Sequence, residues 1–315
     1  MKLKYALLPL AFAVQGLLPA QSFDLIPLGI YGGGDESNLS AYLLGEHGKN
    51  EYISLDAGTL RAGINKAIEN GIFEVSNKTV LQDYIKGYFI SHGHLDHLSG
   101  LVINSPDDGA KPIYALPTTI AILRDKYFTN DAWSNFANEG EQPAIGKYTY
   151  RRVKEDDSFN IENTSLRGKI FRLSHVNPYS SSAVLIQNKE NEAVLYLGDT
   201  GADRVEKSDR LQHLWKEVAP LYAAGKLKAI LIEVSFENSR AETALFGHLT
   251  PKLLNEELQK LAKEAKRKNL SDLKIIVTHL KPGGNNISLI KQQLLGDNPL
   301  NVQYHFPVQG GRILL

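Results

Sequence analysis

The sequence predicts an α/β fold in which polar side chains gather where buried strands end. Four short, apolar, β-branched runs (88–90, 170–173, 194–197 and 275–277) are each followed within two residues by a histidine or an aspartate. Residues 251–268 carry apolar side chains at helical spacing, after a threonine and with a proline suited to the first helical position. Because sites in α/β folds collect at the carboxyl ends of strands, we expect the polar residues that follow the four runs to meet.

The chain opens with a segment that has the composition of an export signal. Two lysines precede an apolar run over 5–18, which ends at Pro19–Ala20. A membrane anchor is the alternative, but the run is short for a hydrocarbon layer of about 30 Å. We therefore expect a signal peptide over 1–20 and a single domain over 21–315. The mature protein is then periplasmic or secreted and free of the membrane.

Composition excludes several classes of protein. The 315 residues include 35 Lys and Arg against 35 Asp and Glu, so no global positive field gathers nucleic acid, and we expect no nucleic-acid partner. The absence of cysteine excludes disulfides, a thiolate nucleophile and cysteine-ligated zinc. Any metal ion must therefore be held by nitrogen and oxygen atoms.

The first strands of the predicted fold lie near the start of the domain. Residues 25–30, 40–44 and 51–55 have strand composition, and glycines at 32–34 and a turn at 47–50 separate them. Hairpins are the economical connection at such spacing. This part of the chain is therefore expected to be an antiparallel set of strands.

Residues 111–167 give a weaker signal. They are polar, aromatic-rich and weakly periodic, which predicts a peripheral region of helices and loops that frames a pocket. Its aromatic residues suit either stacking on a base or packing between helices. These residues are Tyr114, Tyr127, Phe128 and Trp133.

The strongest chemical signal is a cluster of four potential metal ligands within six positions. These residues are His92, His94, Asp96 and His97, and Gly93 between the first two is expected to ease a tight turn. Buried imidazoles and carboxylates each need a partner, so packing alone is a poor explanation for such a cluster. The alternative is a polar surface loop with incidental histidines.

The segment resembles the His-x-His-x-Asp-His signature of the metallo-β-lactamase superfamily, whose fold is a four-layer αββα sandwich. The resemblance implies two divalent metal ions, with zinc the expected element. It assigns three ligands to one ion (His92, His94, His175), three to the other (Asp96, His97, His279) and Asp199 to the position between them. Taken singly, His175 is equally a core histidine, Asp199 a turn residue and His279 a surface residue.

Further segments resemble the class II cyclic-nucleotide phosphodiesterases. They are Gly32-Gly33-Gly34 with Ser37-Asn38-Leu39-Ser40, Leu55 to Thr59, His94 to His97, Ile232 to Phe236, and Thr278 to Pro282. The resemblance implies a hydrolase for small cyclic nucleotides, cyclic AMP and also cyclic GMP. It implies attack by a metal-bridging hydroxide, with Asp96 in the catalytic set, and release of a nucleoside 5′-monophosphate.

Three further residues are candidates for catalysis or substrate binding. His248 precedes the helix predicted from Pro251, which suits proton delivery to the leaving oxygen or a clamp on the phosphate. Glu233 is its candidate partner. The alternatives are that His248 only starts the helix and that Glu233 makes a structural salt bridge. Asn38 beside the glycines could approach the nucleotide, and a plain turn is the alternative.

Other functions remain open at this point. The segments around Glu233 and His248 also look like those of the tRNA 3′-processing branch, which makes an RNA 3′-end endonuclease the alternative enzyme. β-Lactam hydrolysis on the same scaffold and a non-catalytic binding module are further alternatives. The sequence also leaves homodimerisation open.

Overall fold

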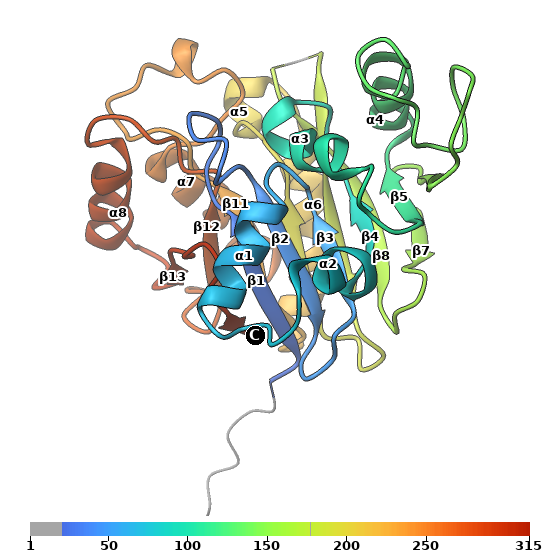
Figure 1. Ribbon diagram of the computed structural model, residues 1–315. Helices are drawn as coiled ribbons and strands as arrows, with labels where there is room; N and C mark the ends of the chain where they lie inside the picture. The colour runs from blue at the N-terminus through green and yellow to red at the C-terminus, as the bar shows by residue number, and fades with distance from the viewer. Residues whose placement is uncertain (1–20, 177) are drawn as a thin grey trace, which may run out of the picture.

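The computed structural model describes residues 21–176 and 178–315, which form two seven-stranded sheets packed face to face (Figure 1). The predicted signal peptide over 1–20 lies outside the described residues. In the described ranges, no helix is long and apolar enough to cross a lipid bilayer.

The first sheet contains the hairpin strands predicted from the sequence. Its order is β14 (Ile313–Leu314), β1 (Phe23–Gly29), β2 (Ala41–Glu46), β3 (Tyr52–Leu55), β4 (Ile85–Phe89), β5 (Lys111–Ala115) and β6 (Tyr148–Arg152). The pairs β1–β2 and β2–β3 are antiparallel, which confirms the prediction for this part of the chain, and β3 to β6 run parallel.

The second sheet carries three of the four runs singled out in the sequence. Its order is β13 (Gln303–His305), β12 (Lys274–Thr278), β11 (Leu227–Glu233), β10 (Ala193–Leu197), β9 (Ser180–Gln187), β8 (Arg167–Ser174) and β7 (Ser158–Asn160). Strands β10 to β13 are parallel, and β8 runs in the same direction as β10 because β9 is antiparallel to both. The carboxyl ends of β8, β10, β11 and β12 therefore share one edge.

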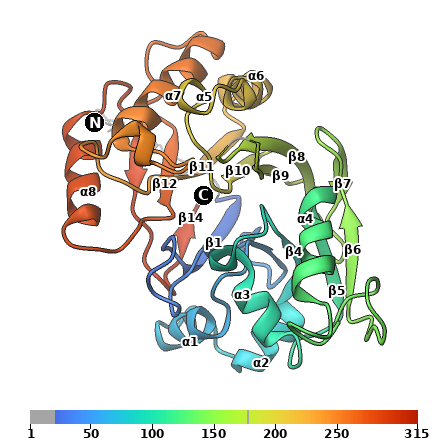
Figure 2. The same ribbon diagram turned by 90° about the horizontal axis from the view of Figure 1, so that it is seen from above.

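Helices cover the outer face of each sheet, as Figure 2 shows from above. Those on the first sheet are α1 (Arg61–Glu69), α2 (Asn77–Thr79), α3 (Leu95–Asn104) and α4 (Pro117–Ile122), with π-helical turns at Val80–Tyr84 and Leu123–Tyr127. Those on the second are α5 (Asp203–Glu206), α6 (Arg210–Ala223), α7 (Pro251–Glu264) and α8 (Asn286–Gly296), with a 3-10 turn at Glu242–Ala244. The result is the predicted αββα sandwich.

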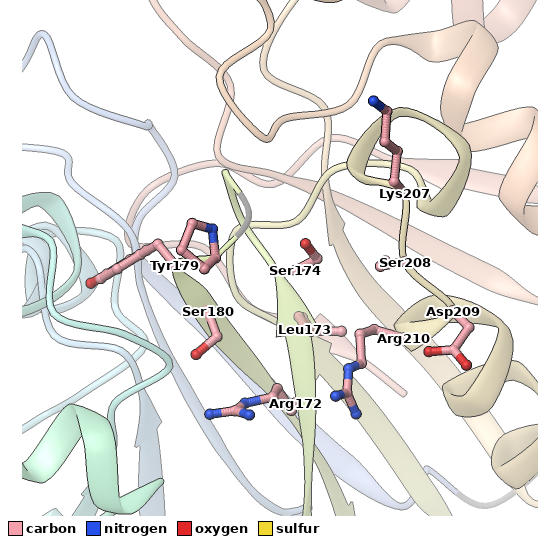
Figure 3. Close-up of a pocket in the computed structure, with 10 residues that line it drawn as sticks. Arg172, Leu173, Ser174, Tyr179, Ser180, Lys207, Ser208, Asp209 and Arg210 are labelled. Atoms are coloured by element: carbon pink, nitrogen blue, oxygen red, sulfur yellow. The ribbon is translucent and has the colours of Figure 1, made fainter.

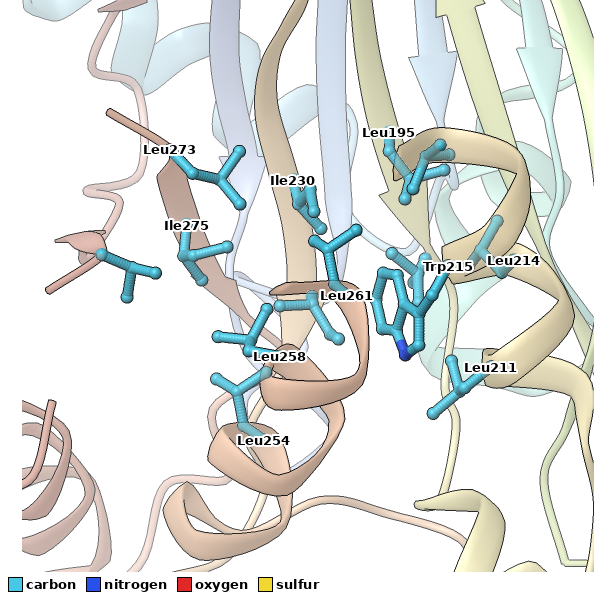
Figure 4. Close-up of a cluster of buried hydrophobic side chains, with 14 of the residues drawn as sticks. Leu195, Leu211, Leu214, Trp215, Ile230, Leu254, Leu258, Leu261, Leu273 and Ile275 are labelled. Atoms are coloured by element: carbon cyan, nitrogen blue, oxygen red, sulfur yellow. The ribbon is translucent and has the colours of Figure 1, made fainter. Parts of the chain in front are cut away.

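Three apolar clusters hold the layers together. Leu25 on β1 lies in the cluster between the sheets, whereas its neighbour Ile26 packs under α1 and α3. Successive side chains of a strand point to opposite faces, so strands buried on both faces read as continuous apolar runs. The third cluster surrounds the buried Trp215 under α6 and α7 (Figure 4), and the indole nitrogen of Trp215 donates to Glu257 at 3.1 Å.

Helix α7 begins as the sequence predicts but ends earlier. The hydroxyl of Thr250 accepts from the backbone N–H of Leu253, and Pro251 occupies the first turn. The helix ends at Glu264, not at Lys268, and Lys266 has a left-handed backbone with φ 54°. Three charged residues follow at 266–268, where no further apolar face continues into the core.

The prediction for residues 111–167 was wrong in part. This region supplies β5 and β6 to the first sheet and β7 to the edge of the second. Strand β5 was missed because it begins with Lys111–Pro112. Lys111 is nevertheless buried, since its ammonium pairs with the carboxylate of Asp108 at 2.7 Å and donates to the carbonyl oxygen of Leu81 at 2.6 Å.

Candidate metal centre and active site

The residues predicted as metal ligands lie at the shared end of the two sheets. Strand β4 ends at Phe89, three residues before His92. Helix α3 begins at Leu95, so the first turn of this helix presents Asp96 and His97. The second sheet brings the remaining ligands from the segments after β8, β10 and β12. The structure brings together all seven predicted positions: His92, His94, Asp96, His97, His175, Asp199 and His279.

Three imidazoles and one carboxylate form a first group. Nδ1 of His94 lies 3.0 Å from Nε2 of His92 and 3.4 Å from Nε2 of His175. Oδ2 of Asp199 lies 3.7 Å from Nε2 of His92 and 3.8 Å from Nε2 of His175. Ligand atoms about 2.0–2.1 Å from a tetrahedral zinc ion are about 3.3 Å apart, so this spacing suits one such ion.

A second group lies on the other side of Asp199. Nε2 of His279 is 3.2 Å from Oδ2 of Asp96 and 3.2 Å from Oδ1 of Asp199, and Nε2 of His97 is also 3.2 Å from Oδ1 of Asp199. Asp199 thus turns one oxygen to each group. A carboxylate in this position can bridge two ions.

Unpaired buried atoms test whether the residues fit a cation. Nε2 of His97 and Oδ1 of Asp199 are buried and have no hydrogen-bond partner among the described residues. Buried polar atoms are rarely left unpaired, because the loss of hydration is costly. A divalent ion between them would satisfy both, and the nitrogen and oxygen donors suit zinc and other divalent transition metals.

Burial and neighbouring charges shift the pKa values of the predicted ligands. Burial lowers the pKa of His92 well below its ordinary value and also lowers the pKa of His94. Burial opposes charge on Asp199, but His279 and His97 hold the pKa of its carboxyl well below the usual range. Burial also opposes charge on His97, yet the carboxylates around it, Asp199 first, raise its pKa. A cation bound there would take the place of that proton.

Asp56, directly after β3, orients a ligand and was not among the predicted site residues. One of its oxygens accepts from Nδ1 of His97 at 2.7 Å and from the hydroxyl of Tyr196 at 2.6 Å, and Ser91 donates to the carboxylate through its backbone N–H and its hydroxyl. This arrangement leaves Nε2 of His97 facing the second group. Its place after a strand, like that of the ligands, is the signal that could have identified Asp56.

Glu233 and His248 form the predicted pair. Oε1 of Glu233 accepts from Nδ1 of His248 at 2.8 Å, and both residues are buried. Burial alone would lower the pKa of His248, but the charge of Glu233 and its hydrogen bond raise that pKa above the ordinary value. Nδ1 of His248 lies 3.9 Å from Oδ2 of Asp199, so the pair adjoins the metal ligands.

Ser235 connects this pair to a metal ligand and was missed by the sequence reasoning. Its hydroxyl donates to Oε2 of Glu233 at 2.7 Å and lies 2.9 Å from Nδ1 of His279. A hydroxyl has one hydrogen, so Ser235 accepts from Nδ1–H of His279. The lone pair on Nε2 of His279 then points toward the second group. Only the place of Ser235 after a strand hinted at this role.

The turn between His92 and His94 is fixed by neighbouring side chains. The hydroxyl of Tyr179 accepts from the backbone N–H of Gly93 at 3.2 Å, and its ring stacks on His94 with centroids 4.9 Å apart. Tyr127 donates to the carbonyl oxygen of Gly93 at 2.8 Å. Gly93 does not have a positive φ, so the expectation that it eases the bend is not supported. A side chain there would collide with Ile122, at 2.6 Å from its Cγ2 atom.

The other aromatic residues singled out in region 111–167 are Tyr114, Phe128 and Trp133, and they pack against the rest of the protein. Tyr114 stacks on Phe159 with centroids 4.7 Å apart, and Phe128 is fully buried. Trp133 donates through its indole nitrogen to the hydroxyl of Ser105 at 3.0 Å. These contacts favour the packing alternative for all three.

The loop after β1 approaches the second group of ligands. A side chain at Gly32 would lie 2.2 Å from the ring of His279, so only glycine allows this approach. Asn38 lies in the same loop, where its Oδ1 atom accepts from the backbone N–H of Ile30 at 3.0 Å. The structure therefore gives Asn38 a bracing contact and does not bring it into the ligand cluster.

A pocket of about 290 Å³ lies beyond Tyr179, on the side of the first group. Figure 3 shows it with Tyr179 on one side and Lys207 and Arg210 on the other. Arg172 and Arg210 both line this pocket, and Arg210 is paired with Glu155, to which it donates at 2.7 Å. The pocket is next to the site but does not contain the predicted ligands.

Known proteins are similar to this chain over most of its length. The family model of the class II cAMP phosphodiesterases matches residues 23–294. A 3′,5′-cyclic-nucleotide phosphodiesterase of Aliivibrio fischeri is 39% identical over 303 residues, which cover 92% of this chain and 92% of that protein. A probable 3′,5′-cyclic-nucleotide phosphodiesterase of Yersinia pestis is 36% identical over 316 residues, which cover 96% of this chain and 92% of that protein.

A solved structure shares the fold over nearly the whole chain. Unliganded yeast PDE1 superposes with a TM-score of 0.84 at 22% identity, covering 94% of this chain and 100% of that one. The fold, the matched family model and relatives similar over most of their length lead to one conclusion. This chain belongs to the class II cAMP phosphodiesterase family.

Proposed function

We propose that this protein hydrolyses 3′,5′-cyclic nucleotides, cyclic AMP and cyclic GMP, to nucleoside 5′-monophosphates. The observation that carries the proposal is the placement of Asp199, which turns one oxygen to each of two ligand groups and lies 3.9 Å from Nδ1 of His248. Membership of the family and the names of the bacterial relatives support the same activity.

Zinc is the proposed metal for both groups. When bound, two such ions supply a nucleophile derived from water near neutral pH and Lewis-acid stabilisation of the phosphoryl oxygens. The chain contributes ligands of fixed orientation. Asp56 and Ser235 set the tautomers of His97 and His279, and the carbonyl oxygen of Gly247 lies 3.0 Å from Nδ1 of His175.

His248 is the proposed proton donor to the leaving 3′ oxygen. Its Nδ1–H donates to Glu233, so the proton available for transfer is the one on Nε2. Glu233 favours the charged imidazole, which is the form that can give up a proton and remain a neutral base. Glu233 is therefore a positioning residue, and His248 is the residue that would contact substrate.

We also propose that the mature protein acts in the periplasm or outside the cell. The support is the composition of residues 1–20, with a basic start, an apolar run and a small residue before the cut. Measurement of the N-terminal residue of the exported protein tests this, with Gln21 expected.

A second candidate activity is RNA 3′-end cleavage. The observation that favours it is the buried pair of Glu233 and His248, because the segments around both resemble those of the tRNA 3′-processing branch. The balanced charge of the chain counts against a large RNA substrate. Cleavage of precursor tRNA by the purified protein at rates above those for cyclic nucleotides would favour this candidate.

Product analysis tests the main proposal. Purified protein with measured metal content should convert cyclic AMP and cyclic GMP to the 5′-monophosphates. Recovery of 3′-monophosphates would contradict the assigned position of His248. Failure of protein carrying two ions per chain to turn over any cyclic nucleotide would refute the proposed activity, and fewer than about one ion per chain would favour a non-catalytic binding module.

A further inference from the structure

A second pocket, of about 380 Å³, is lined in part by Phe236, whose ring contacts that of His248. Its lining residues come from the segments that precede α7 and α8 and from the start of α8. Its lining combines apolar and hydrogen-bonding side chains, as a purine site requires. The residues used below are Phe236, Arg240, Lys281, Asn285 and Asn286.

The position of His248 relates this pocket to the substrate. If His248 gives its proton to the 3′ oxygen, the ribose that carries this oxygen lies on the His248 side of the metal centre. The base is attached only two ring carbons away from that oxygen. The ring of Phe236 is 5.9 Å from that of His248, centroid to centroid, so the first wall beyond the ribose belongs to this pocket. The pocket of Figure 3 has no such contact with His248.

Arg240 is an exposed residue that makes two contacts at this wall. Its guanidinium carbon lies 4.8 Å from the centroid of Phe236, and its Nε donates to the carbonyl oxygen of Ala244 at 3.1 Å. No acceptor among the described residues engages its two terminal nitrogens. A stacked arginine with a free planar edge is suited to bidentate recognition of two acceptors.

The other polar groups of the pocket are engaged or are less constrained. Nζ of Lys281 donates to the carbonyl oxygen of Gly32 at 3.1 Å. The amide of Asn286 donates to the carbonyl oxygens of Ser235 and Lys281. Asn285, at the start of α8, makes no side-chain capping bond. Arg240 is therefore the pre-organised donor of this pocket.

We propose that this pocket is the nucleobase subsite and that Arg240 reads guanine. Guanine presents two adjacent acceptors, O6 and N7, to an arginine, whereas adenine replaces the first with an amino donor. The structure thus favours cyclic GMP over cyclic AMP at this position. The inference rests on the proposed function, because it takes the metal centre as the place where the cyclic phosphate is cleaved.

The variant R240A tests the inference against cyclic GMP, cyclic AMP and bis(4-nitrophenyl) phosphate, a phosphodiester without a base. We expect kcat/KM for cyclic GMP to fall about 10-fold or more, which is the size of one lost bidentate contact. The value for cyclic AMP should change much less, and turnover of the base-free ester and metal content should stay at wild-type levels. R240K should resemble R240A, because an ammonium lacks the planar pair of donors.

R151A is the matched control, since Arg151 on β6 pairs with Glu162 and lines no part of this pocket. It should behave as wild type with all three substrates. If R240A lowers kcat/KM equally for cyclic GMP and cyclic AMP, or for neither of them, the inference is overturned while the proposed function stays in place. A wild-type enzyme that cleaves the base-free ester but no cyclic nucleotide would overturn the proposed function, and the inference with it.

Discussion

At the scale of single residues, the chemistry of the site depends on which ring nitrogen of each histidine carries a proton. A carboxylate sets this for His97, a hydroxyl for His279 and a backbone carbonyl oxygen for His175. In each case the partner takes Nδ1 and leaves Nε2 free for a cation. Partners of this kind raise ligand basicity and fix ring orientation.

Ser235 should therefore be needed for metal binding although it is not a ligand. In S235A the imidazole of His279 loses its acceptor at Nδ1 and can present the wrong tautomer. We expect the affinity of the second group to fall about 10- to 100-fold, as measured by metal titration. S235T retains the hydroxyl and should stay near wild type, and wild-type affinity in S235A would refute the role assigned to this hydroxyl.

His248 should contribute to turnover and not to metal binding. In H248A the leaving oxygen loses its proton donor, so kcat should fall about 10²- to 10⁴-fold while metal content stays unchanged. H213A is the control, because His213 is a partly exposed histidine that pairs with Asp156 and belongs to none of the ligand groups. Loss of metal in H248A would instead identify His248 as a ligand.

At the scale of elements, the sequence predicted where strands end better than which segments are strands. The runs before His92, His175, Asp199 and His279 form strands because their apolar side chains are buried, and each ligand follows within three residues of its strand. Strand β5 escaped prediction since its buried lysine depends on Asp108, an ion pair that no local pattern reveals.

Local sequence patterns also determined which site residues could be predicted, because they do not reveal contacts between distant positions. Ligands cluster in type and spacing, so the His92–His97 segment could be recognised from the sequence alone. Asp56 and Ser235 touch their histidines across 41 and 44 positions of the chain. Contacts at that separation are set by the packing of the two sheets. Arg240 likewise depends on its place above Phe236.

The turn between His92 and His94 allows a test at this scale. In G93A the new methyl group would collide with Ile122, which lies 2.6 Å from the position of the added carbon. The turn must then move, and metal affinity of the first group should fall together with activity. The double variant G93A/I122A removes the obstacle and should recover part of the affinity. Equal metal binding by G93A and wild type would contradict this steric account.

At the scale of the whole molecule, the metal centre joins the two sheets. His92 and His94 follow a strand of the first sheet, whereas His175, Asp199 and His279 follow strands of the second. The sheets otherwise meet through one apolar cluster and contacts at their edges. Ions held between ligands from both sheets therefore act as cross-links that exist only in the folded chain.

Removal of metal should consequently lower the melting temperature. A ligand that binds only the folded state stabilises it by about 2.7 kcal/mol at 100 times its Kd, and removal by a chelator reverses this gain. Asp199 and His97 would also be left with buried atoms that have no protein partner. Thermal unfolding with and without chelator measures the effect, and added zinc should restore the transition. In D199N, which loses the charge shared by both groups, the chelator should lower the melting temperature much less than it does in the wild type. An unchanged melting temperature in wild-type protein shown to be free of metal would mean that the two sheets dock without help from the ions.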